Sequence, residues 1–311
     1  MKSTTGATRR RFLQRAARAA LVMPFLQYSS AEARLPIGFS TLGCPAWDWA
    51  RILDFAQHHG FSSVELRGLQ GEMDLPSRPE FAADRIQQSK KEIAAHGLQI
   101  SCVSSSAEMH HSDPAKHAQQ LADARRFIDL AAALDAPYVR VFGNEMEGPR
   151  EAVMERVASS LRQLGDYAGP KNVTVIIESH GDFTDSPTLK TVLEKSDSPY
   201  VALLWDAFHT YISGKEDPEF TIAQLGKYIR HTHLKDGVKQ GNDMHYVLTG
   251  RGIVPVKKQV QLLAKSGYQG AFSFEWEKVW HPDIDEPEIA IADYARVVTG
   301  YLQDAADAKP Q

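Results

Sequence analysis

The sequence predicts an α/β protein folded as a single (β/α)8 TIM barrel. Eight short apolar runs rich in β-branched residues alternate with eight longer amphipathic segments, which is the pattern of repeated βα units. A chain of 311 residues with 43% hydrophobic content suits either two ordinary domains or one barrel. Because no linker divides the chain into halves, we expect one barrel over residues 34–303 and a polar tail over 304–311.

The apolar runs are the predicted strands, and the segments between them repeat their apolar residues at helical spacing. The strands are IGFSTL from Ile37, SSVEL from Ser62, QISCVSS from Gln99, YVRVFG from Tyr138, TVIIES from Thr174, VALLWD from Val201, IRHTHL from Ile229 and AFSFEW from Ala271. The helices are expected near residues 47–59, 79–96, 114–134, 150–167, 186–195, 218–228, 256–266 and 287–302. Glycines at 60, 97 and 267 follow three of these helices and predict left-handed helix ends that turn the chain into the next strand.

Residues 1–33 resemble a twin-arginine export signal. Arg9, Arg10 and Arg11 precede a short apolar run, and small residues ending at Ala33 form an A-x-A type cleavage site. The alternative is a basic amphipathic helix that stays on the protein. We expect export to the periplasm, with no stable membrane anchor after cleavage.

Removal of this leader makes the protein acidic. The leader carries six of the 35 basic and one of the 39 acidic side chains, so the remainder has a formal balance of −9. Such a protein repels polyanions, and we expect no nucleic-acid partner. The two cysteines, Cys44 and Cys102, follow strands that are not neighbours in a closed sheet, which predicts two buried free thiols and excludes a cysteine-based zinc site.

Each of the last four predicted strands ends in an ionisable residue. They are Glu178, Asp206, His233 and Glu275. In a barrel, functional groups gather at the carboxyl ends of the strands. One such residue alone could simply mark where a strand reaches solvent, but three carboxylates buried together require a compensating cation. We therefore predict one divalent metal ion held by three carboxylates and one imidazole.

The sequence HTH places two histidines on one strand. Residues two apart point to the same face of a strand, so His231 and His233 both face the barrel interior at different depths. His233 is nearer the strand end and is the predicted ligand. His231 is expected to lie one layer lower and to hydrogen-bond a neighbour that holds the ligands in place.

The segments IIESHG, WDAFH, HTHLKD followed by TGRGIV, and FSFEW resemble the xylose isomerase-like TIM-barrel superfamily of sugar isomerases and epimerases, from about residue 35 to 302. The resemblance implies that Glu178, Asp206, His233 and Glu275 bind one divalent metal, Mn²⁺, Mg²⁺ or Co²⁺ ahead of Zn²⁺. It also implies that Glu178 and Glu275 are the catalytic acid–base pair. In the less similar first half, Glu65 in FSSVEL is the main matching feature.

Three residues are predicted to bind substrate, namely Glu65, His209 and Lys235. His209 matches a family histidine that contacts a substrate oxygen, with a solvated loop histidine as the alternative. Lys235 would steady a negatively charged intermediate or would form a salt bridge at the strand end. Thr184 and Lys239 stand where the ketose 3-epimerases of this family carry a glutamate and an arginine, which argues against a free ketohexose as substrate.

Other features leave alternatives open. His110 and His111 follow the third predicted strand and would form part of a substrate wall or of an exposed loop. Arg67 and Arg140 could bind an anionic group. Tryptophans 47, 205 and 276 lie near strand ends, where they could stack on a sugar or belong to the core.

The chemistry indicated is metal-assisted enolisation of a carbohydrate with a carbonyl group. We expect a metal-dependent isomerase or epimerase of carbohydrate metabolism acting on a ketose or keto-sugar. The alternatives are a lyase or hydratase acting on 3-keto-glycosides and a metal-bearing periplasmic sugar-binding protein without turnover. A DNA-repair endonuclease on the same fold would need more ligands and a basic groove. The sequence leaves open whether the protein forms homo-oligomers.

Overall fold

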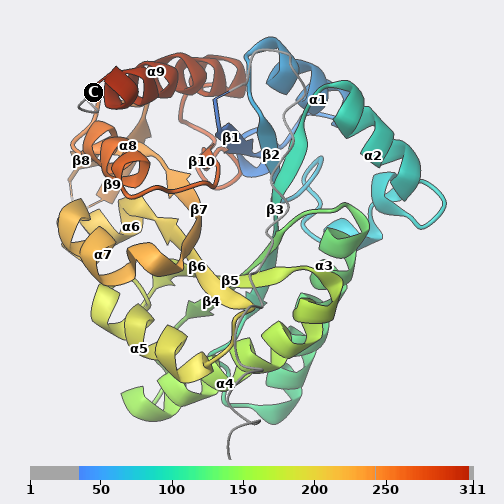
Figure 1. Ribbon diagram of the computed structural model, residues 1–311, viewed down its shortest axis with the longest axis vertical. Helices are drawn as coiled ribbons and strands as arrows, with labels where there is room; N and C mark the ends of the chain where they lie inside the picture. The colour runs from blue at the N-terminus through green and yellow to red at the C-terminus, as the bar shows by residue number, and fades with distance from the viewer. Residues whose placement is uncertain (1–34, 242, 308–311) are drawn as a thin grey trace, which may run out of the picture. The chain divides into compact units, whose positions relative to one another are not determined.

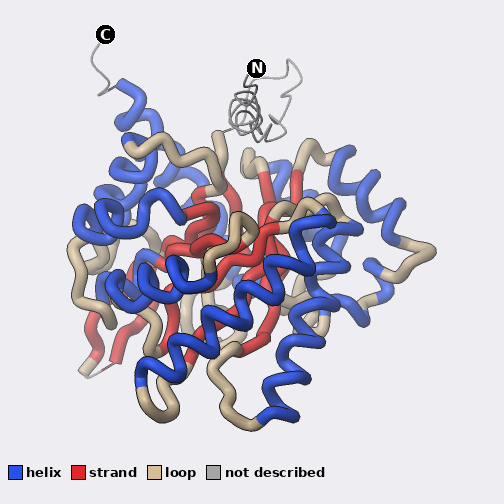
Figure 2. Tube along the Cα trace, turned by 60° about the horizontal axis from the view of Figure 1, so that its bottom comes forward, coloured by secondary structure: helices blue, strands red, loops and turns tan. Residues whose placement is uncertain are grey.

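A computed structural model describes residues 35–241 and 243–307 of the chain. It contains the predicted closed barrel of eight parallel strands, in the order β1-β10-β7-β6-β5-β4-β3-β2. Figure 1 shows the helices arranged around these strands, and Figure 2 shows the strands in red at the centre with helices outside them. Buried side chains form one large core cluster inside this arrangement.

All eight predicted strands are present in chain order, which confirms the fold class. They are β1 (Ile37–Ser40), β2 (Ser63–Leu66), β3 (Gln99–Glu108), β4 (Tyr138–Asn144), β5 (Thr174–Gly181), β6 (Val201–Asp206), β7 (Ile229–Leu234) and β10 (Phe272–Phe274). Strands β1, β2, β6 and β10 are buried along their whole length, as expected for parallel strands covered by helices.

The eight predicted helical segments also form. They contain α1 (Trp49–His58), α2 (Ile86–Ala95), α3 (Pro114–Ala133), α4 (Arg150–Ala168), α5 (Ser186–Ser196), α7 (Pro218–Leu225), α8 (Val256–Lys265) and α9 (Pro287–Asp307). Side chains of Asp113 and Asp185 cap α3 and α5 by accepting backbone N–H groups of the first turn. Gly60, Gly97 and Gly267 have φ of +74°, +65° and +81°, the predicted left-handed conformation.

Three features differ from the prediction or were not predicted. A short helix, α6 (Ala207–Ile212), follows β6 directly, and an antiparallel hairpin of β8 (Asp236–Gln240) and β9 (Asp243–Val247) follows β7. The last helix α9 continues to Asp307, so residues 304–307 are helical rather than part of a polar tail. The predicted export signal at 1–33 and residues 308–311 lie outside the described residues.

Cys44 and Cys102 are both buried and unpaired, as predicted. They lie by β1 and on β3, which are separated by β2 in the barrel. None of the helices in the described part of the chain has the length and apolar character needed to cross a bilayer.

Candidate metal centre

The four ionisable residues predicted at the strand ends converge at one end of the barrel. Glu178 lies on β5, Asp206 ends β6, His233 lies on β7 and Glu275 directly follows β10. These strands are neighbours, and Asp206 pairs with His233 in the register of β6 and β7. All four are buried, and each offers a ligand atom within 4.8 Å of the others.

The imidazole of His233 is central to this group. Its Nδ1 lies 3.1 Å from Glu275 Oε1, 3.6 Å from Glu178 Oε1 and 4.0 Å from Asp206 Oδ2. The same nitrogen is buried and has no aligned hydrogen-bond partner among the described residues. Two ligands of one ion with bonds of about 2.1 Å lie no more than about 4.2 Å apart, so these distances fit a shared divalent ion.

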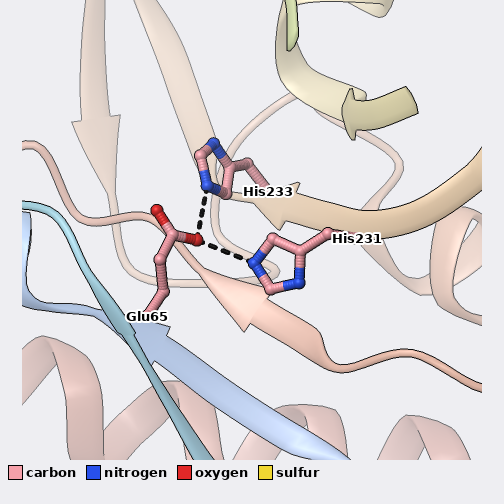
Figure 3. A group of neighbouring side chains, drawn as sticks. All are labelled: Glu65, His231 and His233. Carbon is pink, nitrogen blue, oxygen red and sulfur yellow. Dashed lines mark hydrogen bonds and ion pairs between the residues drawn. The ribbon is translucent and has the colours of Figure 1, made fainter. Parts of the chain in front are cut away.

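Glu65 contacts both histidines of β7 (Figure 3). Its Oε2 lies 2.7 Å from His231 Nε2 and 2.8 Å from His233 Nε2, and all three side chains are fully buried. A neutral His233 therefore carries its proton on Nε2 and presents the lone pair of Nδ1 to the other ligands. This contact confirms that His231 hydrogen-bonds a neighbour of His233, and its role in supporting the ligands without binding metal stays a prediction.

Glu65 was predicted to bind substrate, and the structure shows a different contact set for it. Besides the two imidazoles, its Oε1 accepts a hydrogen bond from Ser104 Oγ at 2.9 Å. Its carboxylate is thus engaged on both oxygens in the interior of the barrel. No local sequence pattern indicates this arrangement, because Glu65 is 168 residues from His233.

The charged side chains of this group shift one another's pKa. Burial opposes ionisation of Glu65, Glu178 and Glu275, but neighbouring cationic groups prevail and lower the pKa of each. For Glu178, Arg140 and His233 lower the pKa to about 2. Burial likewise opposes the charged form of His233, yet the surrounding carboxylates raise its pKa well above the usual value. The metal-free site thus favours ionised carboxylates and a protonated imidazole.

Asp206 is oriented by the helix that follows it. Its Oδ1 accepts the backbone N–H groups of Phe208 and His209 at 2.9 and 3.0 Å, which makes it the N-cap of α6. This contact leaves Oδ2 directed at His233 and at Lys235 Nζ, which donates to it at 2.6 Å. A carboxylate oxygen has two lone pairs, so Oδ2 can accept from Lys235 and still bind an ion.

Lys235 is fully buried among three carboxylates. Its Nζ donates to Asp206 Oδ2 and to Glu275 Oε2, and it forms an ion pair with Glu277 Oε1 at 2.8 Å. Burial disfavours its charge, but Asp206, Glu275 and Glu277 raise the pKa of the ammonium well above its ordinary value. The salt-bridge alternative for Lys235 is therefore realised, at a buried rather than a surface position. Glu277 was not among the predicted site residues, although it lies two residues after Glu275.

The substrate-binding role predicted for Lys235 stays a prediction, as does that of His209. The His209 side chain is partly exposed, and its Nε2 lies 3.5 Å from Asp206 Oδ2. Its ring also contacts that of His180, with centroids 5.0 Å apart. It therefore lies at the margin of the metal centre, where a substrate held there could contact it.

Burial decides between the alternatives left open for Arg140, the three tryptophans and the two histidines after β3. Arg140 is buried, and its Nε lies 3.1 Å from Glu178 Oε2, so it is an ion-pair partner of a ligand. The three tryptophans near strand ends, Trp47, Trp205 and Trp276, are all core residues. His110 and His111 are buried at 1% and 5% exposure, so the expectation of an exposed loop is wrong for their side chains.

Known proteins with sequences similar to this chain include inosose dehydratases. Inosose dehydratase of Bacillus anthracis (strain CDC 684 / NRRL 3495) is 27% identical over 176 residues, which cover 50% of this chain and 56% of that protein. The match thus spans little more than half of that relative. Inosose dehydratase of Geobacillus thermodenitrificans (strain NG80-2) is 23% identical over 244 residues, or 69% and 79% of the two chains.

Solved structures show the same fold at low identity. The structure of L-ribulose 3-epimerase has a TM-score of 0.72 at 20% identity, covering 88% of this chain and 99% of that chain. The IOLI protein with a bound zinc atom also gives 0.72, at 17% identity and 87% and 99% coverage. Residues 53–297 match the family model described as xylose isomerase-like TIM barrel, and the chain therefore belongs to that family.

Proposed function

We propose that the protein is a divalent-metal-dependent sugar isomerase or epimerase that enolises a ketose or keto-sugar. The observation that carries the proposal is the convergence of Glu178, Glu275 and Asp206 on Nδ1 of His233, a buried nitrogen that makes no aligned hydrogen bond to the described residues. Three oxygens and one nitrogen suit Mn²⁺, Mg²⁺ or Co²⁺, with Zn²⁺ ranked after them. An ion held by these side chains would supply Lewis-acid stabilisation of the negative charge that develops on substrate oxygens.

In the proposed reaction, Glu178 and Glu275 would move the protons. Both are held ionised in the metal-free protein, Glu178 beside Arg140 and Glu275 beside Lys235. They come from β5 and from the end of β10, with β6 and β7 between them. One carboxylate can thus remove a C–H proton from a carbon next to the carbonyl, while the other, once protonated, returns a proton to the opposite face.

A lyase reaction on a 3-keto-glycoside is the second candidate. The enolisation step is the same, but a β-oxygen substituent then leaves instead of a proton returning. The inosose dehydratases among the relatives favour this candidate, because a dehydratase expels a β-hydroxyl group. Thr184 and Lys239 occupy the positions of the epimerase glutamate and arginine, which argues further against a free ketohexose.

We also propose that residues 1–33 direct the folded protein to the periplasm by the twin-arginine route. The support is the sequence itself, with adjacent arginines, a short apolar run and small residues before the expected cleavage point after Ala33. The substrate would then be a small carbohydrate of that compartment.

The test is incubation of the metal-loaded protein in D₂O with a panel of ketoses and 3-keto-glycosides. Deuterium incorporation without loss of a substituent is expected for an epimerase, and β-elimination for a lyase. Either activity should be lost in Glu178→Gln and Glu275→Gln, whereas Lys91→Met at an exposed position of α2 should keep it. Metal binding without exchange across the panel would contradict both reactions and favour a binding protein.

A further inference from the structure

A second cluster of histidine and carboxylate side chains lies at the ends of β3 and β4. It comprises Glu108, His110, His111, Glu145 and Glu147, and it shares no residue with the metal centre described above. The ligand atoms of Glu108, His110 and His111 all lie within 4.8 Å of one another. The same holds for His110, Glu145 and Glu147, so His110 is common to both sets.

The backbone on both sides of the cluster is anchored. Glu108 is paired with Phe142 in the register of β3 and β4, and the N–H of Met109 donates to Phe142 O at 2.9 Å. The segment after β4 is held by the N–H of Met146, which donates to Asp182 Oδ2 at 2.8 Å. The cluster is therefore built on strand ends rather than on a free loop.

His110 is oriented as a metal ligand would be. It is 1% exposed, and its Nδ1 lies 3.0 Å from Gly143 O, so the neutral ring donates from Nδ1 and carries a lone pair on Nε2. That Nε2 lies 4.0 Å from Glu145 Oε2. Burial and the neighbouring His111 lower the pKa of His110, which keeps the ring neutral. The same pattern of one fixed and one open nitrogen occurs at His233.

His111 provides a second imidazole with an open nitrogen. Its Nε2 lies 2.9 Å from Glu108 Oε2, but within the described residues this buried nitrogen makes no aligned hydrogen bond. Adjacent ligands of a tetrahedral zinc ion lie about 3.3 Å apart, and no two of them lie more than about 4.2 Å apart. The distance of 2.9 Å between His111 Nε2 and Glu108 Oε2 is compatible with one such ion.

The cluster also lacks a cationic side chain. Glu108, Glu145 and Glu147 form no ion pair with a lysine or arginine in the part of the chain that the structure describes. The nearest arginine contact is Arg156, which donates to the backbone carbonyl of His110 at 2.7 Å. A bound cation would offset the repulsion among these carboxylates.

We propose that Glu108, His110 and His111 bind a second divalent ion, Zn²⁺, with the fourth position left to water. Two imidazoles and one carboxylate suit zinc, whereas the carboxylate-rich first centre suits harder ions. The ion would fix the segment that follows β3. Asn144 joins this segment to the next two strands, since its Nδ2 donates to Glu108 Oε1 at 2.9 Å and its Oδ1 lies 3.1 Å from His180 Nδ1 on β5.

The test counts zinc ions on the full, tag-free chain. Protein stripped with a chelator is titrated with Zn²⁺, desalted and analysed by elemental mass spectrometry. The wild type should retain two ions per chain, and both His111→Gln and the first-centre variant Asp206→Asn should retain one. His117→Gln, a matched control on α3 outside the cluster, should retain two.

A further variant leaves both buried histidines in place. Glu108 is partly exposed, so Glu108→Gln should fold normally and weaken binding of the second Zn²⁺ by about tenfold or more. A wild type that retains a single zinc, a His111→Gln protein that retains two, or a Glu108→Gln protein with unchanged affinity for the second Zn²⁺ would each overturn the proposed site.

Discussion

Glu65 on β2 lies 2.8 Å from Nε2 of His233 on β7, across the interior of the barrel. Strands β1 and β10 separate these two strands, so the contact joins positions that are not neighbours in the sheet. Because the contact engages Nε2 of His233, it leaves Nδ1 for the metal centre. The orientation of the only imidazole in that centre thus depends on a carboxylate from the opposite half of the sequence.

Replacement of Glu65 by glutamine should weaken metal binding at the first centre by about 10 to 100-fold, because the amide accepts poorly from two imidazoles at once. Titration calorimetry with Mn²⁺ measures the effect. Ser104→Ala is the matched control, since it removes a hydrogen bond to the other oxygen of Glu65. That control should change the affinity only slightly. Equal affinities for Glu65→Gln and the wild type would contradict the orienting role of Glu65.

Metal binding should release a proton from His233. Carboxylates raise its pKa well above the usual value despite burial, so the imidazole is protonated in the metal-free protein at neutral pH. An ion must displace that proton from Nδ1. The apparent affinity should therefore rise about tenfold per pH unit until the pH passes the pKa of His233.

Calorimetry in buffers with different ionisation enthalpies detects this release. We expect about one proton per ion for the wild type, with a smaller release in His233→Gln. A binding enthalpy that does not depend on the buffer would show that the ring is already neutral.

Lys235→Met should destabilise the metal-free protein more than the metal-loaded one. The substitution leaves Asp206, Glu275 and Glu277 without their buried ammonium partner. Loss of one partner from a buried ion pair costs about 3–5 kcal/mol. A divalent ion would replace part of the missing charge. Mn²⁺ should therefore raise the free energy of unfolding, measured in urea, by more in this variant than in the wild type.

Lys239→Met is the control for this change, because Lys239 is exposed on β8. Its unfolding free energy should stay within about 0.5 kcal/mol of the wild type. Similar losses in the two variants would mean that the three carboxylates do not depend on Lys235.

The barrel could be predicted because its signals are local. Apolar runs of strand length, helical spacing and glycines with positive φ all lie within a few residues of the elements they define. The four ligand candidates were found in the same way, since each stands at the end of a predicted strand. The β8–β9 hairpin also has a local signal in the sequence, although it was not predicted. The dipeptide Gly-Asn at positions 241 and 242 is typical of two-residue hairpin turns.

The partners of the ligands could not be predicted from local patterns. Glu65 meets His231 and His233 over more than 160 residues of sequence, and Arg140 meets Glu178 from the adjacent strand. Such pairs form only when the barrel closes. The burial of His110 and His111 was misjudged for the same reason, since a histidine pair after a strand reads as a loop until its neighbours are known.

Asp236 should be a major source of stability in the segment after β7. Its Oδ1 accepts the N–H groups of Gly237 and Val254 at 2.8 and 3.1 Å. Its Oδ2 accepts those of Gly250 and Gly252, both at 2.9 Å. One buried carboxylate thus satisfies four backbone donors and fastens the hairpin to the TGRG segment.

Asp236→Asn replaces one acceptor oxygen by an NH₂ group that faces two backbone donors. Hydrogen bonds to charged groups contribute about 1.5–3 kcal/mol each, so we expect a loss of about 3 kcal/mol or more in the free energy of unfolding. Urea unfolding measures the loss, with Asp243→Asn at the exposed start of β9 as the control. Gly252→Ala should also destabilise the protein, because a Cβ there would overlap Asp236 Oδ1 and Gly237 O. If Asp236→Asn unfolded at the same urea concentration as the control, the four backbone donors would have to find other acceptors, and Asp236 would not be what fastens this segment.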